Sequence, residues 1–171
     1  MKRIYLDHAA TAPVDAEVVK AMLPYFSEYY GNASSLHSFG TDAYKAMEDS
    51  RQKVANLIGA SREEIIFTSS GTESDNLAIK GIAAKKKEEI RDIKGPHIIT
   101  SKIEHPAVLD TCKYLETQGF VVQYLSVDKY GTVDIDELKE KILKNTLIVS
   151  IMHANNEIGT IEPIEEIGMV T

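Results

Sequence analysis

Three short polar segments of the sequence each follow a run of strand-forming residues, and they carry the side chains with the most informative chemistry. The segments read SSGTES (69–74), KIEHP (102–106) and HANNEIG (153–159). The runs before them are rich in Ile and Val, which are typical of strands. In a doubly wound α/β sheet, ligands bind outside the carboxyl ends of the strands. We therefore expect the three segments to lie at one edge of a sheet.

The segment SSGTES indicates a site for a small anion. A helix that begins here presents unpaired backbone N–H groups and the positive end of its dipole, which suits a phosphate. Gly71 lets the backbone approach a ligand closely, and Thr72 adds a hydroxyl donor. The segment has neither the lysine of a P-loop nor the glycines of a dinucleotide fingerprint, so a single phosphate monoester is favoured. The alternative is that Ser and Thr only cap the helix.

His105 stands at the end of the second strand, directly before a proline that suits the first turn of a helix. An imidazole in this place can stack on a flat ring and can pass protons near neutral pH. The alternative is a capping or surface histidine. Metal binding is not favoured, because the five histidines of the sequence show no compact ligand spacing.

The third segment contains two amides, Asn155 and Asn156, that can donate and accept hydrogen bonds toward an oxygen on a planar ligand. The alternative is an Asn-rich turn, which is common. A phosphate, a flat ring and an oxygen on that ring together describe pyridoxal 5′-phosphate. The shared position of the three segments at strand ends, rather than any one of them, favours this cofactor.

The pattern of apolar residues predicts strands that alternate with helices along most of the chain. Short strands rich in Ile and Val, separated by helices, indicate a parallel α/β sheet covered on both faces. The expected strands are 3–7, 64–68, 97–101, 120–127 and 146–152. The expected helices are 16–29, 41–58, 73–90, 106–118 and 134–144, and another begins near 162.

The composition is that of an ordinary globular protein. The 171 residues are 43% hydrophobic and 26% charged, and the formal net charge is −7. This charge argues against binding to nucleic acid or to anionic lipid. The single cysteine excludes an internal disulfide, and neither a secretory signal nor a membrane-spanning apolar run is visible. We expect a soluble, cytoplasmic protein.

Several longer motifs resemble the N-terminal part of the cysteine desulfurases. They are YLDHAATAPVD, YGNASSLH, FTSSGTESDNLAIKG, TSKIEHPAVLDTC, GFVVQYL and VSIMHANNEIGTIEPI, which follow the family's order over nearly the whole chain. TESDNLAIKG and HANNEIG are specific to this family among pyridoxal phosphate enzymes. The resemblance implies an aspartate-aminotransferase-like large domain of pyridoxal phosphate fold type I, truncated. It implies an N-terminal segment at 1–14 and the N-terminal part of the cofactor-binding domain at 15–171.

The resemblance also implies roles for individual residues. Gly71 and Thr72 would hold the cofactor phosphate. His105 would stack on the pyridine ring and act as acid and base, and Asn156 would hydrogen-bond the phenolic oxygen of the ring. The implied activity removes sulfur from L-cysteine and leaves L-alanine and an enzyme persulfide. The persulfide would supply sulfur for the synthesis of iron–sulfur clusters and other sulfur compounds. The implied partners are a second copy in a homodimer and an iron–sulfur scaffold or other sulfur acceptor protein.

Two features of the family have no counterpart in this sequence. Family members carry a Schiff-base lysine in a Ser-x-His-Lys context and a later loop cysteine that accepts the sulfur, and these 171 residues contain neither. Cys112 lies mid-helix, where a cysteine packs as a small hydrophobe. The ending EEIGMVT fits a truncation, a frameshift or a fragment. We therefore expect this chain alone to be inactive.

Other assignments remain open from the sequence. Asn32 and His37, in the GNASSLH segment, resemble an active-site edge or a dimer contact. Another pyridoxal enzyme of the same fold, such as a selenocysteine lyase or an aminotransferase, is the nearer alternative function. A catalytically inactive fragment that binds a partner or a phosphate is the more distant one.

Overall fold

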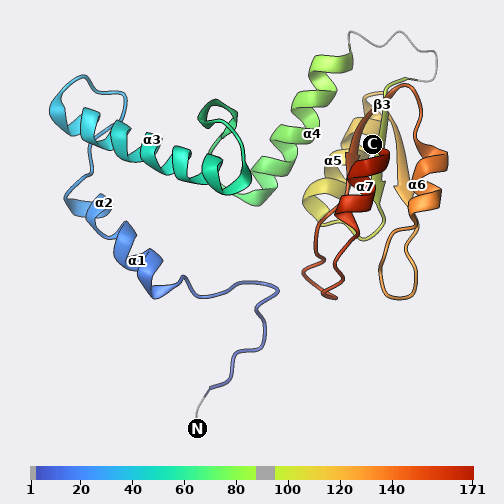
Figure 1. Cartoon of the computed structure of the whole chain (residues 1–171), viewed down its shortest axis with the longest axis horizontal. Helices are drawn as coiled ribbons and strands as arrows, with labels where there is room; N and C mark the ends of the chain where they lie inside the picture. Colours follow the sequence, from blue (N-terminus) through green and yellow to red (C-terminus); the bar gives the residue numbers. More distant parts are fainter. Residues whose placement is uncertain (1–2, 88–94) are drawn as a thin grey trace. The chain divides into compact units, whose positions relative to one another are not determined.

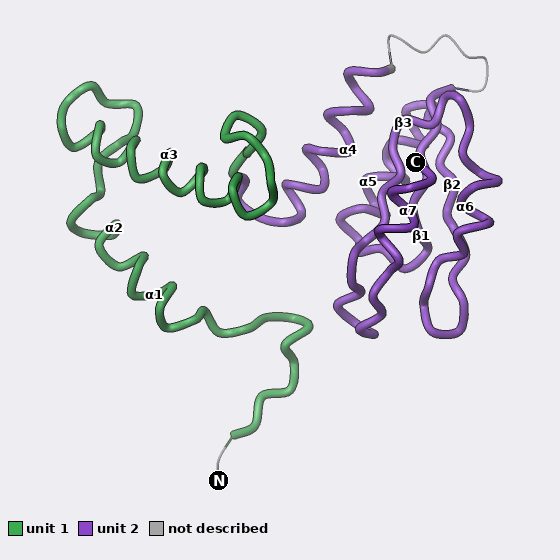
Figure 2. The backbone as a smooth tube through the Cα atoms, in the orientation of Figure 1, with its two compact units in different colours: residues 1–67 green, residues 68–171 purple. Residues whose placement is uncertain are grey.

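The computed structural model describes residues 3–87 and 95–171, and the chain divides into two compact units (Figure 2). The first unit is Met1–Phe67 and the second is Thr68–Thr171. All the residues to which the sequence analysis assigned cofactor contacts belong to the second unit.

The second unit is built on a three-stranded parallel sheet, which confirms the predicted fold class. Its strands are β1 (His97–Ser101), β2 (Val121–Leu125) and β3 (Thr146–Ser150), in the order β2-β1-β3. The central strand β1 is buried at every residue. Its register places Ile99 beside Gln123 of β2 and Val149 of β3.

Helices cover both faces of this sheet (Figure 1). Consecutive residues of β1 belong to two separate cores. Ile98 packs in a core with residues of α4 (Gly71–Lys87) and α5 (Pro106–Thr117). Ile99 packs on the other face with residues of α6 (Ile135–Lys141) and α7 (Ile164–Val170). Such two-sided burial explains why the consecutive residues Ile98 and Ile99 of β1 are both apolar and both buried, rather than one buried and one exposed.

The strand β3 begins with a bulge. His97 is paired with Thr146 and Ile98 with Ile148, so Leu147 is an extra residue on β3. As a result Leu147 and Ile148, although consecutive, both pack against the same core. The pairing is regular from Ile148 to Ser150.

The ends of several helices are set by residues that are typical of those positions. Pro106 occupies the first turn of α5, as expected. Asp134 caps α6 by accepting from the backbone N–H groups of Asp136 and Glu137 at 2.8 and 3.2 Å. Gly59 ends the long helix of the first unit in the left-handed conformation, at φ 69°. The predicted end of α4 at 88–90 lies outside the described residues.

Helices are the only regular elements among the described residues of the first unit. It contains α1 (Ala16–Met22), α2 (Pro24–Ser27), α3 (Ser38–Ile58) and a short 3₁₀ helix, η1 (Arg62–Glu64). The single helix predicted at 16–29 is wrong in one respect, because it divides at Leu23. Pro24 has no N–H with which to continue the helical ladder, and it starts α2 instead.

The strands predicted at 3–7 and 64–68 are also wrong, since neither segment is a strand in the structure. A strand needs a neighbour for its backbone hydrogen bonds, and residues 3–67 contain no other strand. Ile65 does adopt extended dihedral angles, with φ −91° and ψ 124°. Its carbonyl accepts a hydrogen bond from the Arg51 guanidinium of α3. The β propensity is therefore expressed in the backbone angles but not in a sheet.

Candidate cofactor-binding site

The N-terminus of α4 keeps two backbone donors unpaired. The Glu73 carboxylate accepts from the backbone N–H and the hydroxyl of Ser69, both at 2.6 Å. Ser70 Oγ accepts from the Glu73 N–H at 3.2 Å, and the Ser70 carbonyl accepts from the Ser74 N–H at 3.0 Å. The N–H groups of Gly71 and Thr72 have no acceptor among the residues that the structure describes.

This helix end is therefore suited to an anion. Two free N–H groups in the first turn of a 17-residue helix add to the positive end of its dipole. A Cβ atom added at Gly71 would meet nothing within 4 Å, so the space beside these donors is open. The pKa of Glu73 is lowered, mainly because the Ser69 hydroxyl donates to its carboxylate. The helix end thus already holds one carboxylate, and the N–H groups of Gly71 and Thr72 remain available to a further anion.

A cavity of about 340 Å³ brings Thr72 and His105 together. It lies between α4 and α5, and its remaining lining residues are Asn76, Lys80, Pro106, Ala107, Asp110 and Thr111. Two residues predicted from separate motifs therefore share one cavity. The structure adds Asn76 and Lys80, which the sequence analysis missed. Their spacing of four and eight residues from Thr72 places all three on one face of α4.

The face of α4 that lines the cavity is tied to α5. Thr111 Oγ1 donates to Asn76 Oδ1 at 2.9 Å, and Asn76 Nδ2 donates to the Thr72 carbonyl at 2.9 Å. The Lys80 ammonium lies 5.0 Å from the centre of the Tyr114 ring on α5. These contacts place one positive charge in the cavity wall and keep the amide of Asn76 occupied.

His105 is the N-cap of α5 as well as a wall of the cavity. Its Nδ1 accepts from the Ala107 N–H at 3.0 Å. A neutral imidazole that accepts at Nδ1 carries its proton on Nε2. His105 is exposed, so its Nε2–H is available to donate to a ligand. The capping alternative and the ligand-facing prediction are thus compatible in the same side chain.

The structure does not bring Asn156 into this cavity. Asn156 follows the end of β3 in an exposed position, and its side chain has no hydrogen-bond partner within residues 3–87 and 95–171. Its neighbour Asn155 is buried and makes four side-chain hydrogen bonds. The two amides, equivalent in the sequence analysis, therefore differ in their surroundings.

Other candidate groups are placed less favourably for chemistry. Cys112 is fully buried on α5, and burial raises the pKa of its thiol to about 11. No cluster of three or more potential metal ligands occurs in the described parts of the chain. No described helix is both long and apolar enough to cross a membrane.

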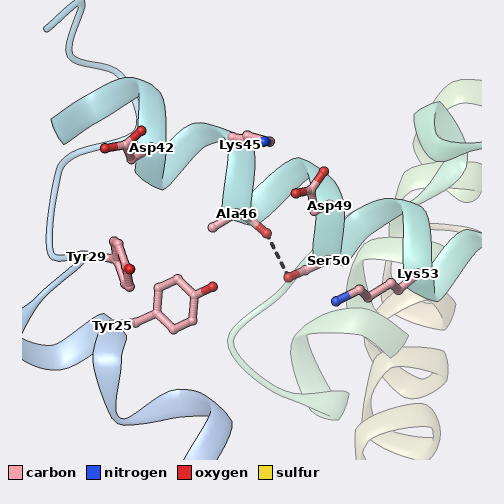
Figure 3. Close-up of a pocket in the computed structure, with 8 residues that line it drawn as sticks. All are labelled: Tyr25, Tyr29, Asp42, Lys45, Ala46, Asp49, Ser50 and Lys53. Carbon is pink, nitrogen blue, oxygen red and sulfur yellow. Dashed lines mark hydrogen bonds between the residues drawn. The ribbon is translucent and has the colours of Figure 1, made fainter. Parts of the chain in front are cut away.

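In the first unit, Asn32 and His37 serve local turns. Asn32 Oδ1 accepts from the Ser34 N–H at 2.9 Å, and His37 Nδ1 accepts from the Gly40 N–H at 3.4 Å at the start of α3. A separate cavity of about 360 Å³ in this unit lies against α3 (Figure 3). It is lined by Tyr25, Tyr29, Asp42, Lys45, Ala46, Asp49, Ser50 and Lys53. None of these residues was predicted to bind a ligand.

Comparison with known proteins defines the class of this chain. Residues 4–171 match the family described as Aminotransferase class-V. The chain therefore belongs to the class-V aminotransferase family. This match spans both units and includes every residue that lines the cavity between α4 and α5.

Individual relatives narrow the similarity further and confirm the resemblance drawn from the motifs. The chain is 54% identical to the cysteine desulfurase IscS of Dictyoglomus turgidum, over 99% of this chain and 42% of that protein. It is 56% identical to the cysteine desulfurase IscS of Methanosarcina thermophila, over 99% of this chain and 41% of that protein. The chain thus spans less than half the length of the curated relatives it matches.

Solved structures give the same result. A NifS-like protein superposes with a TM-score of 0.92 at 44% identity, over 99% of this chain and 45% of that one. SspA in complex with cysteine superposes with a TM-score of 0.88 at 43% identity, over 97% of this chain and 46% of that one.

Proposed function

We propose that this chain is the cofactor-binding part of a pyridoxal-phosphate-dependent cysteine desulfurase. The proposed reaction moves sulfur from L-cysteine to an enzyme thiol, so that L-cysteine and the thiol become L-alanine and a persulfide. The observation that supports it most directly is the shared cavity of Thr72 and His105 beside two free helix N–H groups. The named relatives support the choice of cysteine as substrate.

The described residues fit the phosphate end of the cofactor. The N–H groups of Gly71 and Thr72 and the Thr72 hydroxyl would hold the phosphate, because the helix dipole supplies the positive end that a lysine supplies elsewhere. His105 would lie on the ring face and move protons at Nε2. Asn156 would donate to the phenolic oxygen. Pyridoxal phosphate, when bound, supplies the electron sink that makes cleavage at the substrate's carbon–sulfur bond feasible.

The proposal extends to the setting of the enzyme. It includes a homodimer, a cytoplasmic location, and delivery of the persulfide sulfur to an iron–sulfur scaffold or another acceptor protein. The resemblance to the cysteine desulfurases supports these parts. It also includes inactivity of the 171 residues alone, since none of their lysines has a Ser-x-His-Lys neighbourhood.

A direct assay tests the reaction. The complete gene product that contains these residues is purified with pyridoxal phosphate and given L-cysteine and a thiol reductant. We expect alanine and sulfide in equal amounts. Alanine from L-selenocysteine but not from L-cysteine would indicate a selenocysteine lyase, and no alanine from either would refute the proposal.

The 171-residue chain provides a second test. Mixed with pyridoxal phosphate and reduced with borohydride, it should show no stoichiometric adduct at one defined lysine. Labelling of a single lysine to completion would show that the covalent attachment site lies within these residues.

A further inference from the structure

Side chains join β1 and β3 beyond the point at which their backbone pairing ends. The last paired residues are Thr100 and Ser150. Thr100 Oγ1 also donates to the Ser150 carbonyl at 2.9 Å. Past this pair β3 ends and no further residue of β1 pairs with it, yet two buried side chains continue to connect the two segments. These side chains are Glu104 and Asn155, which are only 6% and 7% exposed.

Glu104 reaches from the β1 side to the β3 side. Its Oε1 accepts from the Met152 N–H at 2.7 Å and from Ser101 Oγ at 3.0 Å. Burial raises the pKa of this carboxyl, although the two donated hydrogen bonds oppose that effect. Glu104 directly precedes His105 in the chain.

Asn155 reaches in the opposite direction. Its Nδ2 donates to the Ile103 carbonyl at 2.9 Å, and its Oδ1 accepts from the N–H groups of Glu157 and Ile158 at 2.8 and 3.1 Å. The side chain thereby fixes its own turn and ties that turn to the end of β1. Asn155 directly precedes Asn156.

We propose that Glu104 and Asn155 form a reciprocal clamp that positions His105 and Asn156 for the reaction. In this clamp, the residue before each site residue holds the segment that carries the other. Neither clamp residue needs to touch the ligand, so both are positioning residues. The inference rests on the proposed function, because it assigns the clamp to the same site. It adds Glu104, which the sequence analysis left without a role, and gives Asn155 a positioning role in place of the ligand contact considered for it from the sequence.

Loss of the clamp would affect catalysis because sheet pairing does not hold the segments that carry His105 and Asn156. Both site side chains are exposed and lie beyond the regular sheet, where the ladder no longer sets the backbone. A displacement of about 1 Å in a catalytic group is enough to cost about 100-fold in rate. A buried donor or acceptor that loses its partner is costly enough to shift the backbone that carries it.

The chain offers a matched control at the other end of the same strands. Asn145 Nδ2 donates to the Gly95 carbonyl at 2.7 Å, which also links the β3 segment to the β1 segment. This bond lies before the two strands rather than after them. Asn145→Asp therefore removes the same kind of bond as Asn155→Asp, at the end away from His105 and Asn156.

Hydrogen exchange in the complete gene product tests whether the clamp is reciprocal, independently of catalysis. We expect Glu104→Ala to speed amide exchange of residues 153–158 by about 10-fold, and Asn155→Asp to do the same for residues 102–106. Glu104→Gln keeps an acceptor for the Met152 N–H and should stay within about twofold of the parent. Exchange that rises only in the mutated segment, or that rises equally in Asn145→Asp, would overturn the clamp.

Kinetics with L-cysteine then test the positioning role. Glu104→Ala and Asn155→Asp should lower kcat by about 10- to 100-fold with a smaller change in KM, while Glu104→Gln and Asn145→Asp stay near the parent. If Asn155→Asp does not fold, the pair Glu104→Ala and Glu104→Gln decides the same question. Equal kcat values in this pair would refute the positioning role. A parent protein without desulfurase activity would refute the proposed function, and the exchange result would still decide the clamp.

Discussion

Thr72→Asp should have opposite effects on stability and on ligand binding. The new carboxylate would stand in the first turn of α4, beside the free N–H groups of Gly71 and Thr72. A negative charge there stabilises a helix by about 0.3–1 kcal/mol. In a protein of the relatives' length, this raises Tm by at most about 2 °C. The same carboxylate occupies the place of the phosphate.

The loss of binding can be worked from two contributions. Removing the Thr72 hydroxyl forfeits one hydrogen bond to a charged group, at the low end about 1.5 kcal/mol. Repulsion between a carboxylate and a phosphate at this exposed position adds about 1 kcal/mol at a separation of ~4 Å in water. The sum corresponds to about 50- to 100-fold weaker binding.

The assay uses pyridoxine 5′-phosphate with the apo form of the complete gene product. This ligand has no aldehyde, so it reports the phosphate site without a covalent bond to any lysine, and pyridoxine serves as the ligand without phosphate. Thr41→Asp, in the first turn of α3, is the control substitution, because Thr41 is also exposed. We expect Thr41→Asp to leave affinity unchanged. If Thr72→Asp raises Tm but binds pyridoxine 5′-phosphate as tightly as the parent, the helix end is only a cap and our assignment is wrong.

Three further predictions concern single residues. His105→Asn keeps a side-chain acceptor at the α5 N-cap, so the complete gene product should melt within a few degrees of the parent. Its desulfuration rate should fall about 10²–10⁴-fold, because an acid–base group is lost. Near-normal activity would show that His105 is only a structural cap. Burial lowers the pKa of His97, so at acid pH the unfolded chain binds more protons than the folded one. The free energy of unfolding should therefore fall as pH drops below about 6.5. Urea midpoints at pH 5 and 7 should show this loss, and His97→Gln should abolish it. The raised pKa of Cys112 predicts that iodoacetamide labels it at neutral pH only when urea unfolds the chain, and fast labelling of the folded protein would contradict its burial.

The sheet of the second unit could be predicted from the sequence because its signals are local. His97–Ser101 is an uninterrupted strand-forming run, and Pro106 and Asp134 each mark the beginning of a helix. The prediction of a strand at 64–68 was wrong because strand formation also depends on a non-local partner. Extended backbone angles at Ile65 follow from residue type, whereas a strand also needs a partner that no local pattern reveals.

The candidate site was predictable in part. Gly71, Thr72 and His105 each follow a strand-like run in the sequence, and the structure places Thr72 and His105 in one cavity although residues 64–68 are not a strand. The different surroundings of Asn155 and Asn156 were not predictable. Both are amides in one turn, and only the three-dimensional course of the chain decides that Asn155 is the one turned inward to Ile103.

The bulge at Leu147 has a consequence for how this fold tolerates changes in chain length. An extra residue in a strand must be absorbed somewhere, since a one-residue slip would send every following side chain to the wrong face of the sheet. Here it is absorbed at the first pair of β3, and pairing is regular from Ile148 to Ser150. Insertions or deletions near 142–147 can therefore be accommodated at the beginning of the strand. Related chains can vary in length there while the far end of β3, with the turn that follows it, keeps its register.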